Sequence, residues 1–217
     1  LTLMLIVLPE TNTKKTPFSF RVLSQRAGIL LTSPIFIGST LICGFVYGCI
    51  IVFNTMGPFL IQTLLGRSAV FYGYMALIMG EAFIIGNYTN KRLIAFPLRP
   101  RLDMALLVMV VAAIIECLML FIFPLNVYNI VIPTFVIIVA CGVFFPNGYG
   151  TALRLHPEFS GTISAIMSAC FIFTSAVISA IASGIKVHNQ LGFSVIFIVF
   201  TDFHIRTQIF IDSLKLS

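Results

Sequence analysis

The stretch FFPNGYGTALRLHPEFSGTISA, residues 144–165, interrupts two long apolar segments and decides how they are joined. Pro146 falls inside the first segment, where a proline removes the backbone hydrogen bond to the carbonyl of Gly142 and bends a helix. His156-Pro157-Glu158 then predicts a tight polar turn before a second apolar segment. The stretch therefore predicts two membrane helices that are connected by a short turn, the first of them bent near its end.

The composition of the whole chain supports a membrane protein. Hydrophobic residues make up 59% of the sequence and charged residues only 9%, whereas soluble domains carry about 25% charged residues. The net charge of +6 does not indicate a nucleic-acid partner, because the Lys and Arg residues are confined to predicted loops, as membrane topology requires. We expect an all-α integral membrane protein whose main contact is the lipid bilayer.

Apolar segments of the length needed to cross a bilayer, about 20 residues, divide the chain. The first nine residues, 1–9, resemble the end of a preceding transmembrane helix, and residues 10–28 predict a basic connecting loop. A transmembrane bundle is expected over 29–211 and a short tail over 212–217. The expected spans are 29–53, 69–88, 103–124, 128–151 and 160–184, with a sixth that begins near Leu191.

The Lys and Arg residues indicate the orientation. Arg67 and Lys186 lie on one side of the predicted spans, and the remaining basic residues lie on the other. The positive-inside rule makes the richer side cytoplasmic. The loops 10–28, 89–102 and 152–159 and the C-terminus are therefore expected in the cytoplasm.

Both ends of the chain are irregular. The sequence begins with Leu, and the apolar run 191–201 would extend about 17 Å, short of a hydrocarbon core of about 30 Å. Extending it to Ile211 brings Asp202 and Arg206 into the span. These features lead us to expect an open reading frame that is broken at both ends.

Two acidic residues, Glu81 and Glu116, lie within predicted spans. Ionisable groups at membrane depth usually face a cavity or bind a partner, and they are frequent proton carriers in transporters. Each acid has two interpretations that the sequence leaves open. It is either a proton-coupling residue or a neutral acid that is hydrogen-bonded between helices.

Other polar positions also have two interpretations. The segment GEAFIIGNYTNKRL, 80–93, either anchors a span at the cytoplasmic surface or forms a gating loop that docks on a neighbouring helix; its candidate residues are Gly86, Asn90, Lys91 and Arg92. The bend at Pro146 is either a plain kink or part of a cavity lining. His156 fits a structural turn better than a proton carrier.

Small residues recur every four positions in the apolar segments. One row is Ser160, Ser164 and Ser168, and a second is Gly161, Ala165 and Ala169; Gly44 and Gly48 repeat the spacing in the first span. Such rows allow close helix packing in lipid. The cysteines lie in apolar runs without a C-x-x-C pair, so we expect no metal site and no cofactor.

Three motifs together resemble a known transporter family. They are Leu8-Pro9-Glu10-Thr11, then Gly86-x-x-x-Asn90-Lys91-Arg92-Leu93, and finally Pro146-Asn147 followed by His156-Pro157 and Gly161-Thr162-x-Ser164-Ala165. They are similar to the end of helix six, the loop between helices eight and nine, and the helix ten to eleven signature of the major facilitator superfamily. Over residues 1–190 the chain most closely resembles the C-terminal half of the Bcr/CflA-type drug-resistance group.

This resemblance implies a six-helix C-terminal bundle preceded by the end of helix six. It also implies a proton-coupled multidrug efflux transporter, a multi-pass protein of a bacterial inner membrane. Its partners would be protons, small amphipathic drugs or metabolites, and an N-terminal half that is missing here. Burial and chemistry, rather than a motif, suggest the candidate substrate-cavity residues Phe53, Asn54, Met56, Phe83, Phe144 and Asn147.

Two other functions remain open at this point. The chain is either such a transporter half or a non-functional remnant of a disrupted transporter gene. An intramembrane hydrolase that uses Glu81 and Glu116 as a catalytic pair is a third possibility. The sequence contains no G-x-G-D, H-E-x-x-H or G-x-S-x-G motif, so we do not expect an enzyme.

Overall fold

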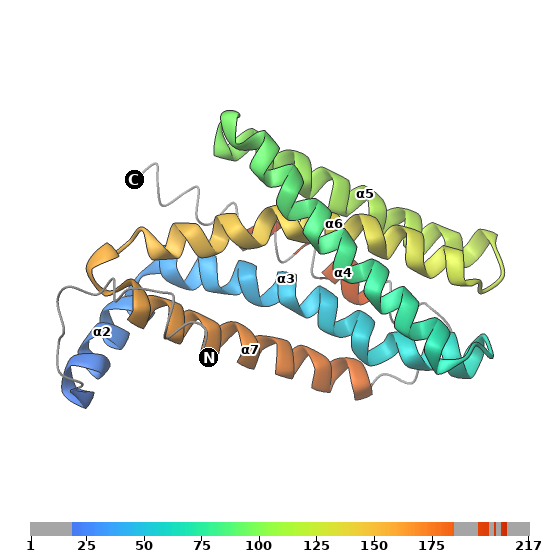
Figure 1. Ribbon diagram of the computed structural model, residues 1–217, viewed down its shortest axis with the longest axis horizontal. Coiled ribbons are helices and arrows are strands. Elements are labelled where there is room, and N and C mark those ends of the chain that lie inside the picture. Colours follow the sequence, from blue (N-terminus) through green and yellow to red (C-terminus); the bar gives the residue numbers. More distant parts are fainter. Residues whose placement is uncertain (1–18, 185–194, 200–201, 203–204, 208–217) are drawn as a thin grey trace, which may run out of the picture.

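The computed structural model describes residues 19–184, 195–199, 202 and 205–207, and this part of the chain is helical apart from short connections (Figure 1). The expected segments 1–9 and 212–217, and most of the sixth span, lie outside the described residues. The elements are α2 (Phe20–Thr32), α3 (Pro34–Pro58) with the π-helix η1 (Phe59–Leu64), α4 (Ala69–Arg92) with η2 (Leu93–Ala95), α5 (Leu98–Ile122), α6 (Val127–Leu153), η3 (Pro157–Phe159) and α7 (Ser160–Gly184).

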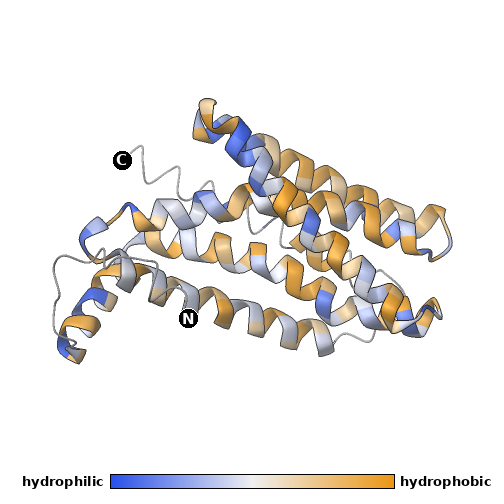
Figure 2. Cartoon of the chain, in the orientation of Figure 1, coloured by the Kyte–Doolittle hydropathy of each residue, from blue (hydrophilic) through white to orange (hydrophobic). Residues whose placement is uncertain are grey.

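Five of the described helices are long and apolar enough to cross a bilayer, and the shortest of these segments has 22 residues. At about 1.5 Å per residue, that length exceeds a hydrocarbon core of about 30 Å. Figure 2 shows hydrophilic residues near the helix ends and hydrophobic residues along the shafts. The chain is an all-helical, multi-pass membrane protein, as the sequence predicted. The spanning segments are Pro34–Leu64, Ala69–Ala95, Leu98–Met119, Val127–Leu153 and Pro157–Gly184.

The first span differs from its predicted bounds of 29–53. Ser33 is the N-cap of α3, its hydroxyl accepts a hydrogen bond from the backbone N–H of Phe36, and Pro34 occupies the first turn. Proline is favoured there because the first turn needs no internal N–H donor. The helix then continues past Pro58 into η1 and ends before Gly66, whose φ is 63°. The span is therefore shifted toward the C-terminus.

The predicted loop 10–28 contains a helix, because its residues from Phe20 onward belong to α2. Leu30 of α2 is fully buried in a cluster with Phe36 and Met167. The guanidinium of Arg26 lies 5.1 Å from the ring centre of Phe159. These contacts hold α2 against the ends of α3 and α7, where it lies at a steep angle to the bundle (Figure 1).

Helices α3 and α6 form the centre of the bundle. In each of them, 61% of the most apolar 18-residue stretch is buried, compared with 17 to 28% in the other three spans. Helix α3 packs mainly against α6 and α7, and α6 packs mainly against α3, α4 and α5. The largest buried side chains of this core include Phe53, Met56, Phe144, Ile130 and Ile137. Helix α5 therefore lies at the periphery, with α6 as its main neighbour.

The pattern of contacts between helices stays the same if α3 and α6 change places and α4 and α7 change places. The extensive α3–α7 interface corresponds to the extensive α6–α4 interface, while the consecutive pairs α3–α4 and α6–α7 touch little. Helices α3 and α6 run in opposite directions (Figure 1). Each extensive interface includes a glycine of the central helix, namely Gly44 against Thr174 and Gly142 against Gly86. The described part of the bundle thus has an inverted internal repeat.

The small-residue rows have mixed outcomes. Gly44 and Gly48 are buried in α3, as predicted. On α7, however, the row Gly161, Ala165 and Ala169 is exposed. The buried residues of α7 are instead Ile163, Met167, Ser175, Ile178 and Ala182. In lipid, close packing rather than removal of apolar area from water selects the buried face of a helix, and on α7 this face carries both large and small side chains.

Candidate functional site

Three polar side chains from three different helices meet near the α4–α5 connection. Arg101 of α5 donates from Nη2 to Oδ1 of Asn147 over 2.9 Å. Asn147 of α6 in turn donates from Nδ2 to Oδ1 of Asn90 in α4 over 2.8 Å. We call this set of Asn90, Arg101 and Asn147 the polar junction. It joins α4, α5 and α6 by side-chain hydrogen bonds at one end of the bundle.

Pro146 lies inside helix α6, which is helical on both sides of it. Asn147 follows this proline, and its side-chain Nδ2 also donates to the carbonyl oxygen of Val143 over 2.6 Å. The hydroxyl of Thr151 donates to the carbonyl oxygen of Asn147 over 2.8 Å. These hydrogen bonds fix the side chains of Asn147 and Thr151 against their own helix in the turns around Pro146.

The close crossing of α4 and α6 brings Asn90 within reach of Asn147. A Cβ atom added to Gly86 would collide with the carbonyl oxygen of Val139 and would lie 2.8 Å from the Cα of Gly142. A Cβ on Gly142 would likewise lie 2.5 Å from the carbonyl oxygen of Phe83. Because residues four apart share a helix face, Gly86 places Asn90 on the side of α4 that faces α6.

Arg101 is the residue of this site that the sequence analysis missed. It is only 7% exposed, and its Nε and Nη1 atoms have no hydrogen-bond partner among the described residues. From the sequence Arg101 is expected only as a cytoplasmic charge, because the predicted span begins at residue 103. The helix begins at Leu98 instead, and this earlier start carries Arg101 into the α4–α6 interface region.

The structure differs from the predicted gating loop in two respects. All four candidate residues, Gly86 to Arg92, belong to helix α4, because nothing breaks the helix before Leu93. Lys91 and Arg92 are exposed, and the Nε of Arg92 donates to the hydroxyl of Tyr88, one turn earlier in the same helix, over 2.9 Å. Gly86 and Asn90, rather than the basic pair, make the contact with a neighbouring helix.

Glu116 lies in a second polar site, between α5 and α6. Glu116 and Thr134 are both 0% exposed. The hydroxyl oxygen of Thr134 lies 3.3 Å from Oε1 of Glu116 and 2.7 Å from the carbonyl oxygen of Ile130. A hydroxyl has only one proton to donate, and the shorter contact favours Ile130. The contact with Glu116 is therefore weaker than the contact with Ile130, and Oε2 of Glu116 has no hydrogen-bond partner among the described residues.

The two acids do not form a pair. Glu81 is exposed on α4, while Glu116 is buried and its hydrogen bond is to Thr134. Among the described residues no hydrogen bond or ion pair joins them. The arrangement required for a catalytic pair of carboxyl groups is therefore not present in the described part of the chain.

The other candidate cavity residues lie in different surroundings. Phe53, Met56 and Phe144 are buried in the packed core, each with an exposure of 2% or less. Asn54 is exposed, and its Oδ1 accepts a hydrogen bond of 3.4 Å from the hydroxyl of Tyr72. Phe83 packs edge-to-face against Phe145, with ring centres 6.0 Å apart. Of the predicted set, only Asn147 belongs to the polar junction.

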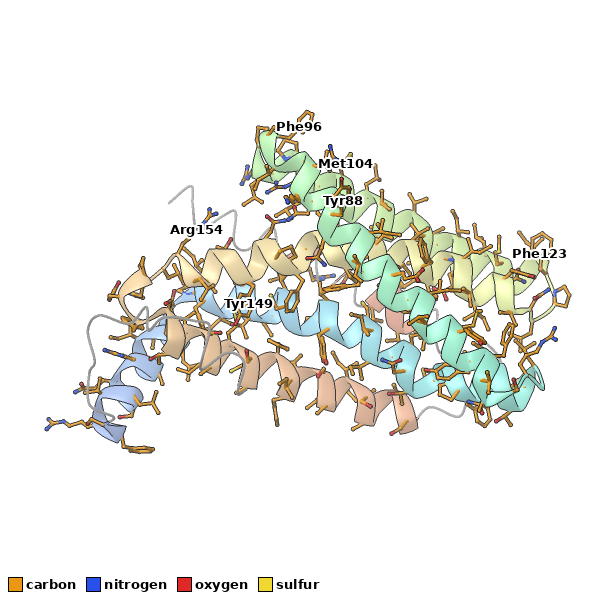
Figure 3. All side chains as sticks on the ribbon, viewed as in Figure 1. Tyr88, Phe96, Met104, Phe123, Tyr149 and Arg154 are labelled. Atoms are coloured by element: carbon orange, nitrogen blue, oxygen red, sulfur yellow. The ribbon has the colours of Figure 1, made fainter. Side chains whose placement is uncertain are left out.

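The residues from His156 to Phe159 form a turn between α6 and α7. Nδ1 of His156 lies 3.1 Å from Oε1 of Glu158, and the His156 ring stacks on Phe159 with ring centres 4.7 Å apart. Pro157 begins the short helix η3. In α7, the hydroxyl of Ser164 is hydrogen-bonded to Tyr149 of α6, whose position Figure 3 marks. Gly161 is exposed and Thr162 is half-buried.

No group of three or more His, Cys, Asp or Glu residues that could hold a metal ion occurs within the described ranges. The five cysteines are free thiols, and three of them are buried. The chain has no matching protein-family model and no matching curated protein. The functional argument therefore rests on the geometry of the helices and of the two polar sites.

Proposed function

We propose that the chain is the C-terminal half of a proton-coupled multidrug efflux transporter of the major facilitator superfamily, in a bacterial inner membrane. The observation that carries this proposal is the inverted repeat, in which the α3–α7 and α6–α4 interfaces correspond. Transporters of this superfamily contain two inverted three-helix repeats within each six-helix half. The first repeat would be α3, α4 and α5. The second would be α6, α7 and the helix that begins near residue 191.

The polar junction supports the same proposal. Asn90 and Asn147 belong to two separate motifs of the sequence, and their side chains are hydrogen-bonded to each other. The junction would couple the end of α4 to the part of α6 that follows Pro146. In a transporter whose two halves rock about a central site, such a connection would transmit movement at one membrane surface to a cavity-lining helix.

The two acids take different roles in this proposal. Glu81 is exposed on α4 and would face the opposing half, where an acid can bind and release a proton as access alternates. Glu116, hydrogen-bonded to Thr134 between two helices, would be a structural residue. The substrates would be small amphipathic molecules that bind between the two halves.

The proposal is tested by dye efflux from a bacterium that lacks its own efflux pumps. The chain is expressed alone and together with the N-terminal half of a related drug transporter. We expect energy-dependent efflux only from the combination, and we expect it to disappear when the proton gradient is collapsed. Gradient-driven efflux by the chain alone, or none from any combination of correctly inserted halves, would contradict the proposal.

A matched pair of variants tests the roles of the acids in the active combination. Glu81→Gln removes the exposed acid and is expected to abolish proton-driven efflux. Glu116→Gln is nearly isosteric and keeps a polar group beside Thr134, so it is expected to leave most of the efflux intact. The reverse order would show that Glu116 is the coupling residue.

A further inference from the structure

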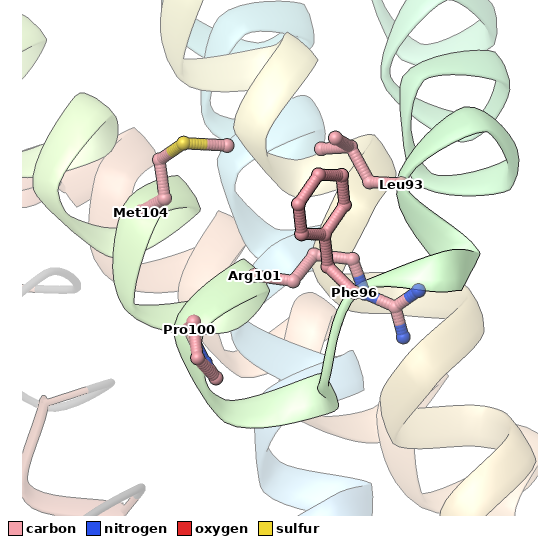
Figure 4. Close-up of a pocket in the computed structure, with 5 residues that line it drawn as sticks. All are labelled: Leu93, Phe96, Pro100, Arg101 and Met104. Carbon is pink, nitrogen blue, oxygen red and sulfur yellow. The ribbon is translucent and has the colours of Figure 1, made fainter.

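Three pockets along α5 follow one another and share lining residues. The first, of about 180 Å³, is formed around Phe96, Pro100 and Arg101 (Figure 4). The second, of about 90 Å³, shares Arg101 and Met104 with the first. The third, of about 320 Å³, shares Val108 with the second. We call these three neighbouring pockets together the α5 groove; its α5 residues include Arg101, Met104, Val108, Val111, Ile115 and Met119.

The α5 groove has the length and polarity of a lipid chain site. From Arg101 to Val111 the helix rises by about 15 Å, which is half of a hydrocarbon core of about 30 Å. Apart from Arg101, the groove residues on α5 are apolar, and Met104 and Val111 are 50% and 45% exposed. Because α5 packs mainly against α6, the groove opens at the periphery of the bundle, where lipid surrounds the protein.

One end of the groove contains a buried arginine. Arg101 lines the first two pockets, and its Nε and Nη1 atoms are buried without a hydrogen-bond partner among the described residues. Arg99 lies at the same end of α5, and Lys91 lies at the adjoining end of α4. The acid nearest in sequence, Asp103, lies two residues after Arg101, about 200° around the helix, so it belongs to the opposite side of α5.

We propose that the α5 groove binds an anionic phospholipid of the cytoplasmic leaflet, with its phosphate on Arg101 and one acyl chain along α5. The Nε and Nη1 atoms of a guanidinium form a fork that matches two phosphate oxygens. Basic pockets between membrane helices on the cytoplasmic side are typical sites for anionic head groups. The charge at one end and the apolar wall beyond it together fit this occupant. This site does not depend on the proposed efflux function.

Phe96 covers the head-group end. Figure 4 shows its side chain beside that of Arg101, and both residues line the first pocket. Phe96 is 60% exposed and lies in the connection after η2, so its ring can turn outward without disturbing the core. Bound phosphate would take the place of this ring beside Nε and Nη1.

The test uses the full chain in bilayers that contain spin-labelled phosphatidylglycerol or spin-labelled phosphatidylcholine. We expect the fraction of spin-labelled lipid whose motion the protein restricts to be larger for phosphatidylglycerol than for phosphatidylcholine. Arg101→Gln is expected to lower the relative affinity for phosphatidylglycerol by roughly five-fold, the effect of about one basic residue near a membrane surface. Arg154→Gln removes an exposed charge that lies outside the groove, and it is expected to leave the preference unchanged.

A second variant keeps the proposal testable if Arg101→Gln prevents folding. Val108→Trp fills the groove at a position that is 39% exposed and leaves Arg101 intact, so it should lower the restricted fraction of both lipids. Inorganic phosphate alone should not displace the labelled lipid, because it lacks the acyl chain. Equal restriction of both lipids by the unmodified chain, no effect of Val108→Trp, or displacement by inorganic phosphate would overturn the proposal.

Discussion

At the scale of single residues, two glycines set the distance between α4 and α6. Gly86 and Gly142 face each other where the helices cross, and neither position has room for a Cβ atom. Gly80, also in α4, has open space around it. Gly86 and Gly80, both in α4, therefore differ in whether a side chain fits, and alanine substitutions at these two positions form a matched pair.

We predict that Gly86→Ala destabilises the bundle by about 1–3 kcal/mol, the usual cost of overpacking, because the added methyl collides with the backbone of Val139. Gly80→Ala is expected to be neutral or to stabilise α4 by up to about 1 kcal/mol. Reversible unfolding in mixed detergent measures both values. Equal stability of the two variants would show that the close crossing is absent.

Glu116 gives a second prediction at the residue scale, since it is fully buried and its contact with the hydroxyl of Thr134 is long, at 3.3 Å. Glu116→Gln should change the free energy of unfolding by less than about 1 kcal/mol, because the side-chain amide is nearly isosteric and keeps an oxygen that accepts from Thr134. Thr134→Val should cost about 0.6–1.7 kcal/mol, the range for hydrogen bonds between membrane helices. A much larger loss for Glu116→Gln would indicate an ionised carboxylate with another partner.

At the scale of elements, the pairing of α3 with α7 corresponds to the pairing of α6 with α4. The α3–α7 interface contains a hydrogen bond between Thr55 and Ser179, whose hydroxyl oxygens are 2.9 Å apart. It also contains Gly44, where an added Cβ would lie 3.0 Å from the side chain of Thr174. These contacts hold together two helices that are separated by three others in the sequence.

We predict that the double variant Thr55→Cys with Ser179→Cys forms a disulfide under mild oxidation, because the side-chain ends already lie near the distance of about 2 Å that an S–S bond requires. The control pairs Thr55→Cys with Ala180→Cys, since Ala180 is exposed and its side chain is rotated by about 100° around α7. Cleavage between the helices followed by non-reducing electrophoresis detects the link. Equal cross-linking in both variants would contradict the α3–α7 interface.

At the scale of the whole molecule, the distribution of basic residues predicts which end of the bundle faces the cytoplasm. The connection after α3 lies at one end, and α2 lies at the other, together with the turn before α7 (Figure 1). Only Arg67 is basic in the connection 65–68, whereas α2 contains Arg21 and Arg26. This difference in basic residues predicts that the end with α2 faces the cytoplasm and the end with the connection 65–68 faces the opposite side.

We predict that a cysteine placed at Thr63 reacts with a membrane-impermeant maleimide from outside intact cells, whereas one placed at Gln25 reacts only after lysis. Both positions are exposed, and their charged surroundings place them on opposite sides by the positive-inside rule. The unmodified chain is the control for labelling of the native thiols. Labelling of the Gln25 variant from outside would reverse the orientation.

The amino-acid sequence by itself determined the class of the protein and the number of described spans. Long apolar runs between polar connections are sufficient for this, because a bilayer imposes a minimum length on every spanning helix. Capping residues and prolines then explain most of the boundaries. The first span was placed too early because Pro34, a helix start, was included within an apolar run.

Only the tertiary structure decided which polar residues meet. Asn90, Arg101 and Asn147 are far apart in the sequence, and their hydrogen bonds depend on the close crossing of α4 and α6 at Gly86 and Gly142. The same is true of the two acids, of which Glu116 is buried between helices and Glu81 is exposed. Helical periodicity gives the face on which a residue lies, but which neighbour covers that face depends on contacts between segments distant in sequence.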